Sequence, residues 1–202
     1  MIETTRLKKR IISIALLGFL VVAPCSAMSA KGRVAAGILV PSGTHVLVDG
    51  KLGLGEWADA RRIASLDSTA IYLKRDAKYL YVAVRPEGGA FSVDLYFDRR
   101  DTRAILDLHA SAKLGEREGT FGQWPEWLWW NNRGWAANVL RVVTFEPRES
   151  LADEVKEYQI EVGRLRARHV WLSADVQKGE VTRSIPSHGA ERYGRHWLGL
   201  RL

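Results

Sequence analysis

The stretch Phe91-Ser92-Val93-Asp94-Leu95-Tyr96-Phe97-Asp98 alternates between two sets of side chains. Phe91, Val93, Leu95 and Phe97 form one set, and Ser92, Asp94, Tyr96 and Asp98 form the other. Because successive side chains of a β-strand point to opposite faces, this period of two predicts a strand with its first set in a core. The charged run Arg99-Arg100-Asp101 predicts the end of that strand.

Shorter stretches with the same period lie on both sides of it. They predict strands at 46–48, 71–73, 79–84, 104–112, 138–145, 158–162, 170–176 and 196–202. Turn signals such as Asp76-Ala77-Lys78 and Gly88-Gly89 separate them, and no long amphipathic helix is evident. Residues 56–62 predict about one helical turn, and 149–157 a charged loop or short helix. Many short strands between turns predict an all-β fold, a jelly-roll-like antiparallel β-sandwich.

The first thirty residues have the features of a signal peptide. A basic region with Arg6, Lys8, Lys9 and Arg10 precedes an apolar stretch at 11–22, and small residues follow up to Ala30. This order is typical of a secretory leader, with cleavage between residues 27 and 30. The predicted organisation is a signal peptide at 1–30, an N-terminal arm at 31–44 and one sandwich domain at 45–202. The expected location is the periplasm or the extracellular space.

Charge and cysteine content limit the function classes. The formal net charge is +7, and the leader holds four basic residues and one acidic residue, so the rest of the chain carries about +4. This mild, dispersed excess does not predict a nucleic-acid partner. Cys25 is the only cysteine, so the mature chain has no disulfide and no thiol ligand. Lipid attachment at Cys25 stays open, although Pro24 before it suits such signals poorly. No membrane span is expected in the mature chain, since the apolar stretch of the leader is short.

Five of the eight tryptophans lie within Trp124-Pro125-Glu126-Trp127-Leu128-Trp129-Trp130-Asn131-Asn132-Arg133-Gly134-Trp135. We call residues 124–135 the tryptophan segment. It neither alternates nor forms a smooth aliphatic run, so it does not match a core strand. Indoles beside hydrogen-bonding groups suit the apolar face and polar rim of a sugar ring. The alternative is a loop that folds under the sandwich as a plug, and the two interpretations can hold for different residues.

Spacing within the segment gives candidate carbohydrate-binding residues. Trp127 and Trp130 are the expected stacking platforms, and Trp135 is either a platform or a core residue. The expected polar contacts to the sugar come from Glu126, Asn131, Asn132 and Arg133.

Catalysis is not expected. No G-x-S-x-G or HExxH motif is present. A glycosidase needs two carboxylates at a set separation. The candidate carboxylates are Glu126, Asp94 and Asp98, but acidic residues on the outer face of a strand are usually solvated.

Three segments in order resemble the family 9 carbohydrate-binding modules. The first is Val48-Asp49-Gly50-Lys51-Leu52-Gly53-Leu54-Gly55-Glu56-Trp57-Ala58-Asp59-Ala60, which is similar to the family's opening "DGxLxxxEW" pattern. The second joins 71–84 with Val93-Asp94-Leu95-Tyr96-Phe97-Asp98, and the third joins Gly134-Trp135-Ala136-Ala137 with Tyr158-Gln159-Ile160-Glu161-Val162. The Ile-Pro pair of the family pattern does not follow Glu161. The resemblance implies a β-sandwich that binds glycan.

Two further expectations concern a cation and partners. Asp49 and Glu56 in the opening pattern either cap turns or help to hold a structural Ca²⁺. The expected partner is a glycan or polysaccharide, with a neighbouring glycan-active enzyme beside the protein. The alternative is an envelope scaffold or protein-interaction sandwich that has lost its glycan site.

Overall fold

The computed structural model describes residues 37–53, 55–64, 68–87, 91–99, 104–120, 123–131, 133–139, 155–186 and 196–202. The predicted leader at 1–30, with Cys25, lies outside these residues. Among the described residues there is no helix of the length and apolar character that crossing a bilayer requires.

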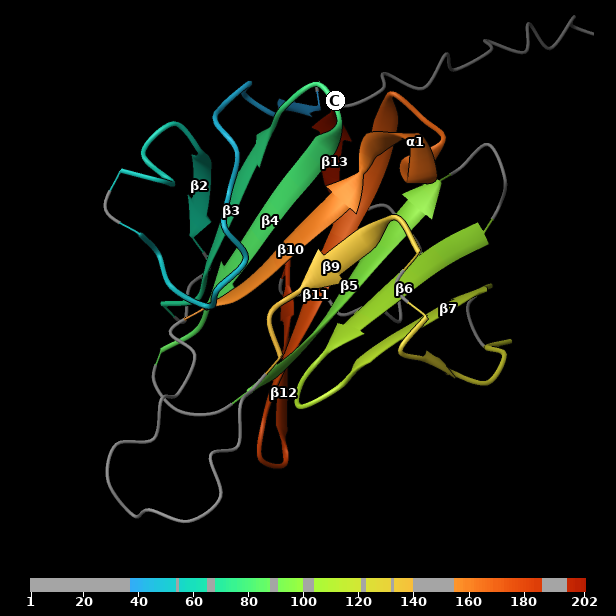
Figure 1. The fold of residues 1–202 in the computed structure, drawn as a ribbon. Helices are drawn as coiled ribbons and strands as arrows, with labels where there is room; N and C mark the ends of the chain where they lie inside the picture. The colour runs from blue at the N-terminus through green and yellow to red at the C-terminus, as the bar shows by residue number, and fades with distance from the viewer. Residues whose placement is uncertain are drawn as a thin grey trace, which may run out of the picture. The chain divides into compact units, whose positions relative to one another are not determined.

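Two β-sheets make up the fold (Figure 1). The larger sheet has the strand order β1-β13-β11-β5-β6-β7-β8, and β12 pairs with β11. Its strands are β1 (Ile38–Leu39), β5 (Ser92–Arg99), β6 (Ala104–Ala110), β7 (Leu114–Gly119), β8 (Leu128–Trp129), β11 (His169–Lys178), β12 (Val181–Ile185) and β13 (Leu198–Arg201). The smaller sheet has the order β2-β3-β4-β10-β9. Its strands are β2 (Arg61–Ala64), β3 (Ala70–Arg75), β4 (Tyr79–Arg85), β9 (Trp135–Ala137) and β10 (Lys156–Glu161). One short helix, α1 (Val162–Leu165), follows β10.

The core lies between the two sheets. Val93, Leu95 and Phe97 of β5 are fully buried in it, together with residues of β4 and β10 from the other sheet. The alternation in 91–98 is therefore the pattern that sets β5, and the two neighbours of β5, β6 and β11, pair with it antiparallel. The predicted fold class, an antiparallel β-sandwich, is confirmed. Among the described residues the parallel pairings are that of β1 with β13 and the isolated bridge between Ser42 and Arg75.

Each sheet is also covered on its outer face. A second apolar cluster covers the smaller sheet, where Val46 and Trp57 pack against Tyr81 and Ala83. A third cluster covers the larger sheet, where Trp197 packs against Tyr96 and Ile105 and Trp124 lies beside them. These covers explain why strands such as β4 are buried on both faces and lack clean alternation.

Glu157 of β10 holds the opening pattern in place. Its carboxylate accepts hydrogen bonds from the backbone N–H of Asp49 (2.9 Å) and Gly50 (2.8 Å) and from Trp57 Nε1 (2.9 Å). Gly50 has a φ of 85°, a conformation that favours glycine. Trp57 is buried, as expected of a core residue. The "DGxLxxxEW" pattern is therefore the outer cover of the smaller sheet.

Several local predictions need correction. Of the arm predicted at 31–44, the described part from Gly37 onward joins the sandwich, because β1 pairs with β13 and Val40 is buried. Residues 46–48 form no strand, although Val46 is buried in the cover. Glu157 belongs to β10 rather than to a charged loop. The strands β2, β7 and β12 were not expected. The strand predicted at 138–145 falls mostly outside the described residues.

Candidate functional site

The tryptophan segment folds back on the edge of the larger sheet. Its residues Leu128–Trp129 form β8, which pairs antiparallel with β7, so that Trp129 lies opposite Gly115. The β7 glycines make room for it. A Cβ on Gly115 would lie 2.7 Å from the ring of Trp129, and one on Gly119 would lie 2.7 Å from the backbone oxygen of Gln123. The absence of side chains at these two positions lets the segment lie directly on the sheet.

Three indoles and two cations form a continuous row of contacts on this part of the sheet. The rings of Trp127 and Trp129 are stacked, with centroids 5.4 Å apart and planes at 26°. The Arg117 guanidinium lies 4.1 Å from the centre of the Trp127 ring and 4.5 Å from that of Trp124. Lys113 Nζ lies 3.7 Å from the centre of Trp129. We call these five residues the indole–cation row. Cation–π contacts and stacking make it a rigid layer.

The two expected platforms differ in this structure. Trp127 is partly exposed, and its ring is in contact with Trp129 and Arg117. Trp130 is 59% exposed and, among the described residues, makes no ring contact. Its φ of 60° is unusual for a non-glycine residue, and it follows the 40% exposed Trp129. The side chain of Trp130 is therefore exposed to solvent, directly after a residue that is held on the sheet.

The other expected residues divide into buried, exposed and undescribed. Trp135 is 4% exposed and stacks on Tyr158 in the core, so it is a core residue and not a platform. Glu126 and Arg133 are exposed, and Asn131 is partly exposed. Asn132 lies outside the described residues.

Glu116 of β7 ties the segment to both sheets. Its Oε2 accepts a hydrogen bond from Trp135 Nε1 (2.7 Å) and one from Arg164 Nη2 (2.8 Å). Asn131 Nδ2 donates to its Oε1 (3.2 Å). Arg164 Nη1 also donates to the backbone oxygen of Arg133 (2.7 Å). The backbone after Trp130 is therefore fixed by a buried carboxylate and an arginine.

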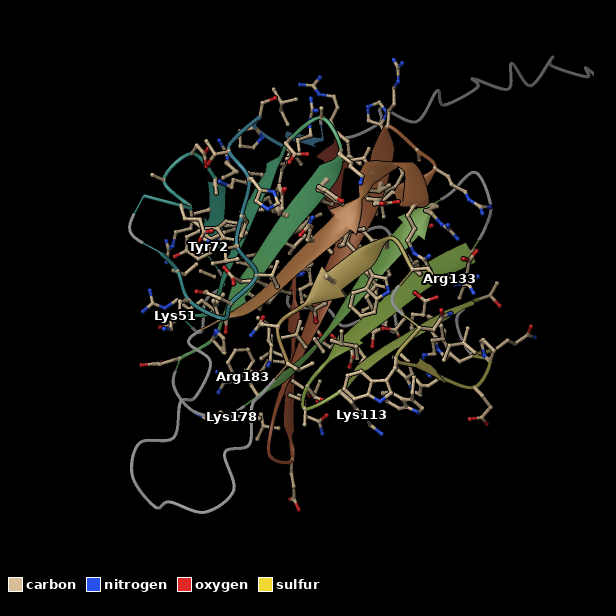
Figure 2. All side chains as sticks on the ribbon, in the orientation of Figure 1. Lys51, Tyr72, Lys113, Arg133, Lys178 and Arg183 are labelled. Atoms are coloured by element: carbon tan, nitrogen blue, oxygen red, sulfur yellow. The ribbon has the colours of Figure 1, made fainter. Side chains whose placement is uncertain are left out.

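A polar cavity of about 380 Å³ opens beside this anchor. Its lining comes from the turn before β9, from the ends of β5, β7 and β10, and from α1 with the residue that follows it. The lining residues are Arg99, Glu118, Arg133, Gly134, Glu161, Gly163, Arg164 and Arg166. Figure 2 places Arg133 on the β6–β7 side of the molecule, away from Tyr72 and Lys51. We call this space the arginine cavity. Its volume lies within the range of small-molecule sites, which is about 300–1,000 Å³.

A Ser–His–Asp alignment lies on the outer face of the larger sheet. His109 Nδ1 is 2.6 Å from Asp94 Oδ1, and His109 Nε2 is 2.8 Å from Ser111 Oγ. In the hairpin turn, however, the N–H of Ser111 donates to Lys113 O and the N–H of Lys113 donates to Ser111 Oγ. These amides are therefore not available as oxyanion donors, which acyl transfer needs. The arginine cavity is not lined by any of the three residues.

Asp107 lies beside this alignment, buried beneath the cover of the larger sheet. Burial raises its pKa, Asp94 raises it further, and the hydrogen bond from Arg117 Nε (2.8 Å) opposes the rise. Burial also raises the pKa of Tyr96 on the neighbouring strand. These groups form a polar layer under the indole–cation row.

The candidates for a structural Ca²⁺ are occupied by backbone contacts. Glu56 Oε1 accepts from the N–H of Leu47 (2.6 Å), and Asp49 Oδ1 accepts from the N–H of Lys51 (3.0 Å). Within the part of the chain that the structure describes, no group of three or more His, Cys, Asp or Glu residues is arranged to hold a metal ion. Calcium at Asp49 and Glu56 stays a prediction.

Comparison with known proteins finds a likeness in structure. No protein-family model matches the chain, and no curated protein matches it. A solved structure, a family 9 carbohydrate-binding module from Caldicellulosiruptor kristjanssonii in complex with cellotriose, is 15% identical. The likeness covers 82% of this chain and 92% of that one, with a TM-score of 0.48. Because these values do not assign the chain to that family, the resemblance in the sequence stays a prediction.

Proposed function

We propose that this protein binds carbohydrate without cleaving it, with the indole of Trp130 as the surface on which a sugar ring stacks. The observation that carries the proposal is the 59% exposure of Trp130 at a left-handed backbone position. Its neighbour Trp129 is stacked and paired with Lys113, so Trp130 extends from a fixed base. A platform whose backbone is already held in place loses less conformational entropy on binding.

Polar groups for the rim of the sugar lie close by in sequence. Arg133 is exposed three residues after Trp130, and Asn131 is partly exposed. The contacts from Glu116 and Arg164 fix this part of the backbone. Exposed indole and anchored polar groups together suit the two kinds of surface on a pyranose.

Substitution of Trp130 tests the proposal. A stacked sugar buries roughly 60 Å² of indole, worth about 1.5 kcal/mol at ~25 cal/mol per Å², so Trp130→Ala weakens glycan binding about tenfold. The measurement is affinity electrophoresis and titration calorimetry with xylan, cellulose and their oligosaccharides. Leu47→Ala, which removes another exposed apolar side chain, outside the tryptophan segment, is the control and leaves affinity unchanged.

Trp127→Ala tests whether Trp127 stabilises the indole–cation row. This change removes the stack on Trp129 and the contact with Arg117, so we expect a lower midpoint of thermal unfolding.

If Trp130→Ala and Leu47→Ala bind glycan equally well, Trp130 is not the platform. If the unaltered protein binds none of the polymers, the proposal of carbohydrate binding fails.

A second candidate function is a protein-interaction sandwich without a glycan site. It is favoured by the packing of most indoles within the protein, as in Trp57, Trp135 and Trp197. The exposed apolar side chains of Leu128, Trp129 and Trp130 would then form the contact with a protein partner. Glycan-insensitive tryptophan fluorescence together with self-association or partner capture that depends on Trp130 would favour this function.

We further propose that the protein is exported, in line with the leader predicted at 1–30, and acts beside a glycan-active enzyme. Binding by a single platform is weak and reversible, which suits a module that holds a polymer while another protein modifies it.

A further inference from the structure

We propose that the arginine cavity recognises the carboxylate of an acidic saccharide, so that the glycan bound at Trp130 is one that carries uronic acid. This inference rests on the proposed function, because it adds a charged subsite to the same site. The two parts are joined by the chain itself, since Arg133 lines the cavity and lies three residues after Trp130.

The cavity has an excess of positive charge. Four arginines line it against two glutamates. Arg99 Nη2 is paired with Glu118, and Arg164 is paired with Glu116 outside the cavity lining. Glu161 lies 3.7 Å from Lys78 Nζ. The pairs account for both carboxylates that line the cavity.

Two arginines remain without a carboxylate. Arg133 and Arg166 are exposed, and within the described residues neither side chain has an ion pair or hydrogen bond. A guanidinium offers two parallel N–H groups that match the two oxygens of a carboxylate. Two such groups at one cavity form a complementary site for a single carboxylate-bearing ring.

The cavity is held in shape before a ligand arrives. Arg164 Nη1 donates to Arg133 O, and Arg99 Nη1 donates to Arg164 O (3.4 Å). Gly134, with a φ of 71°, forms the turn after Arg133, and a Cβ there would lie 3.1 Å from Glu161 Oε2. The glycine therefore keeps the space between the arginines and Glu161 open.

The charge pattern favours an acidic sugar over a nucleic acid. Nucleic-acid surfaces carry cations in a row that follows successive phosphates. Here the two unpaired arginines belong to one cavity of about 380 Å³. An exposed indole lies nearby in the chain, which supplies the apolar contact that a sugar ring needs.

The test compares two xylo-oligosaccharides of equal length, one neutral and one with a glucuronate branch. Titration of the full chain at low salt is expected to give at least tenfold tighter binding of the branched oligosaccharide, and added salt reduces that difference. Arg133→Gln with Arg166→Gln removes the difference, so that this variant binds the branched and the neutral oligosaccharide equally well.

The matched control is Arg61→Gln with Arg62→Gln. Both residues are exposed on β2, at the far edge of the smaller sheet from β9, so this variant loses the same charge at a distance. We expect it to bind both oligosaccharides as the unaltered protein does. If it loses the preference equally, net charge rather than the cavity is responsible, and the inference is overturned.

The remaining outcomes separate the inference from the proposed function. Suppose that the unaltered protein binds both oligosaccharides equally, and that Trp130→Ala weakens this binding. If substitution of Arg133 and Arg166 then has no effect, the inference is overturned and carbohydrate binding is kept. Binding of neither oligosaccharide overturns both. Single-stranded DNA that displaces the branched oligosaccharide, with the same dependence on Arg133 and Arg166, overturns the inference in favour of nucleic acid.

Discussion

At the scale of single residues, similar side chains have different roles because their surroundings differ. Trp127, Trp130 and Trp135 lie within nine positions of one another. Trp127 is part of a stacked layer, Trp130 is exposed, and Trp135 donates to a buried carboxylate. The sequence shows an unusual group of indoles, but it does not decide whether Trp135 is a binding platform or a core residue. Exposure depends on Glu116 and Gly115, which pair with the segment in space, so it could not be predicted from spacing.

Ser111 offers a direct test of the prediction that the protein has no serine-hydrolase activity. Although His109 is aligned with Asp94 and Ser111, the turn amides that would stabilise an oxyanion are engaged in the hairpin. We therefore expect no covalent labelling by a fluorophosphonate probe, measured by mass spectrometry of the intact protein. A labelled Ser111 that is lost in Ser111→Ala and in His109→Ala would show that the protein is an enzyme.

At the scale of elements, β7 explains why part of the site was not predicted. Its sequence Leu114-Gly115-Glu116-Arg117-Glu118-Gly119 has no apolar alternation. One side of this strand carries glycines on which the indoles lie and Arg117, which joins the indole–cation row. On the other side, Glu116 and Glu118 pair with arginines. By contrast, β5 was predicted because its alternation depends on burial in the core alone.

β10 supplies a test through Glu157, which holds the cover of the smaller sheet. Burial raises the pKa of Glu157 to about 7, and the hydrogen bonds from Gly50, Trp57 and Asp49 oppose the rise. A raised carboxyl pKa means that the folded state binds more protons than the unfolded one. The stability from this group is fully present below pH 4.5, the ordinary pKa, and is lost as the pH rises through about 7.

We therefore expect the free energy of unfolding to fall between these pH values, by up to about 1.4 kcal/mol per pH unit from this group. Glu157→Gln reduces that slope and lowers stability by about 1–3 kcal/mol, because one of the two accepting oxygens becomes an NH₂ group and a donor such as Trp57 Nε1 loses its acceptor. Urea unfolding at a series of pH values measures both effects. Glu161→Gln, at the partly exposed end of the same strand, keeps the slope. Equal slopes for the unaltered protein and Glu157→Gln would contradict the assignment.

At the scale of the whole molecule, the sequence predicted the sandwich more fully than the site. Alternation in β5 and neighbouring strands sets which side chains enter the core, and that property is local. The covers depend on contacts such as Glu157 with Gly50, more than a hundred positions apart. The opening pattern resembles a family motif in sequence, but its role as a cover of the smaller sheet follows only from those long-range contacts. Long-range pairing of this kind leaves no period in the sequence.

Export is the prediction that concerns the whole chain. Expression with the complete leader in a Gram-negative host is expected to give a periplasmic or secreted protein that begins between residues 28 and 31. Mass spectrometry of the purified protein measures the mass of its N-terminus. A protein that keeps Met1 and remains inside the cell would contradict the predicted leader.

The arginine cavity takes its walls from β5, β7, the turn before β9, the end of β10 and α1. These pieces are distant in the chain and belong to both sheets. A peptide that reproduces the tryptophan segment would therefore carry the rings and Arg133 but not Arg99, Arg164 and Arg166. A site built in this way cannot be transferred to another scaffold as a single segment, and its transfer would require the supporting strands of both sheets as well.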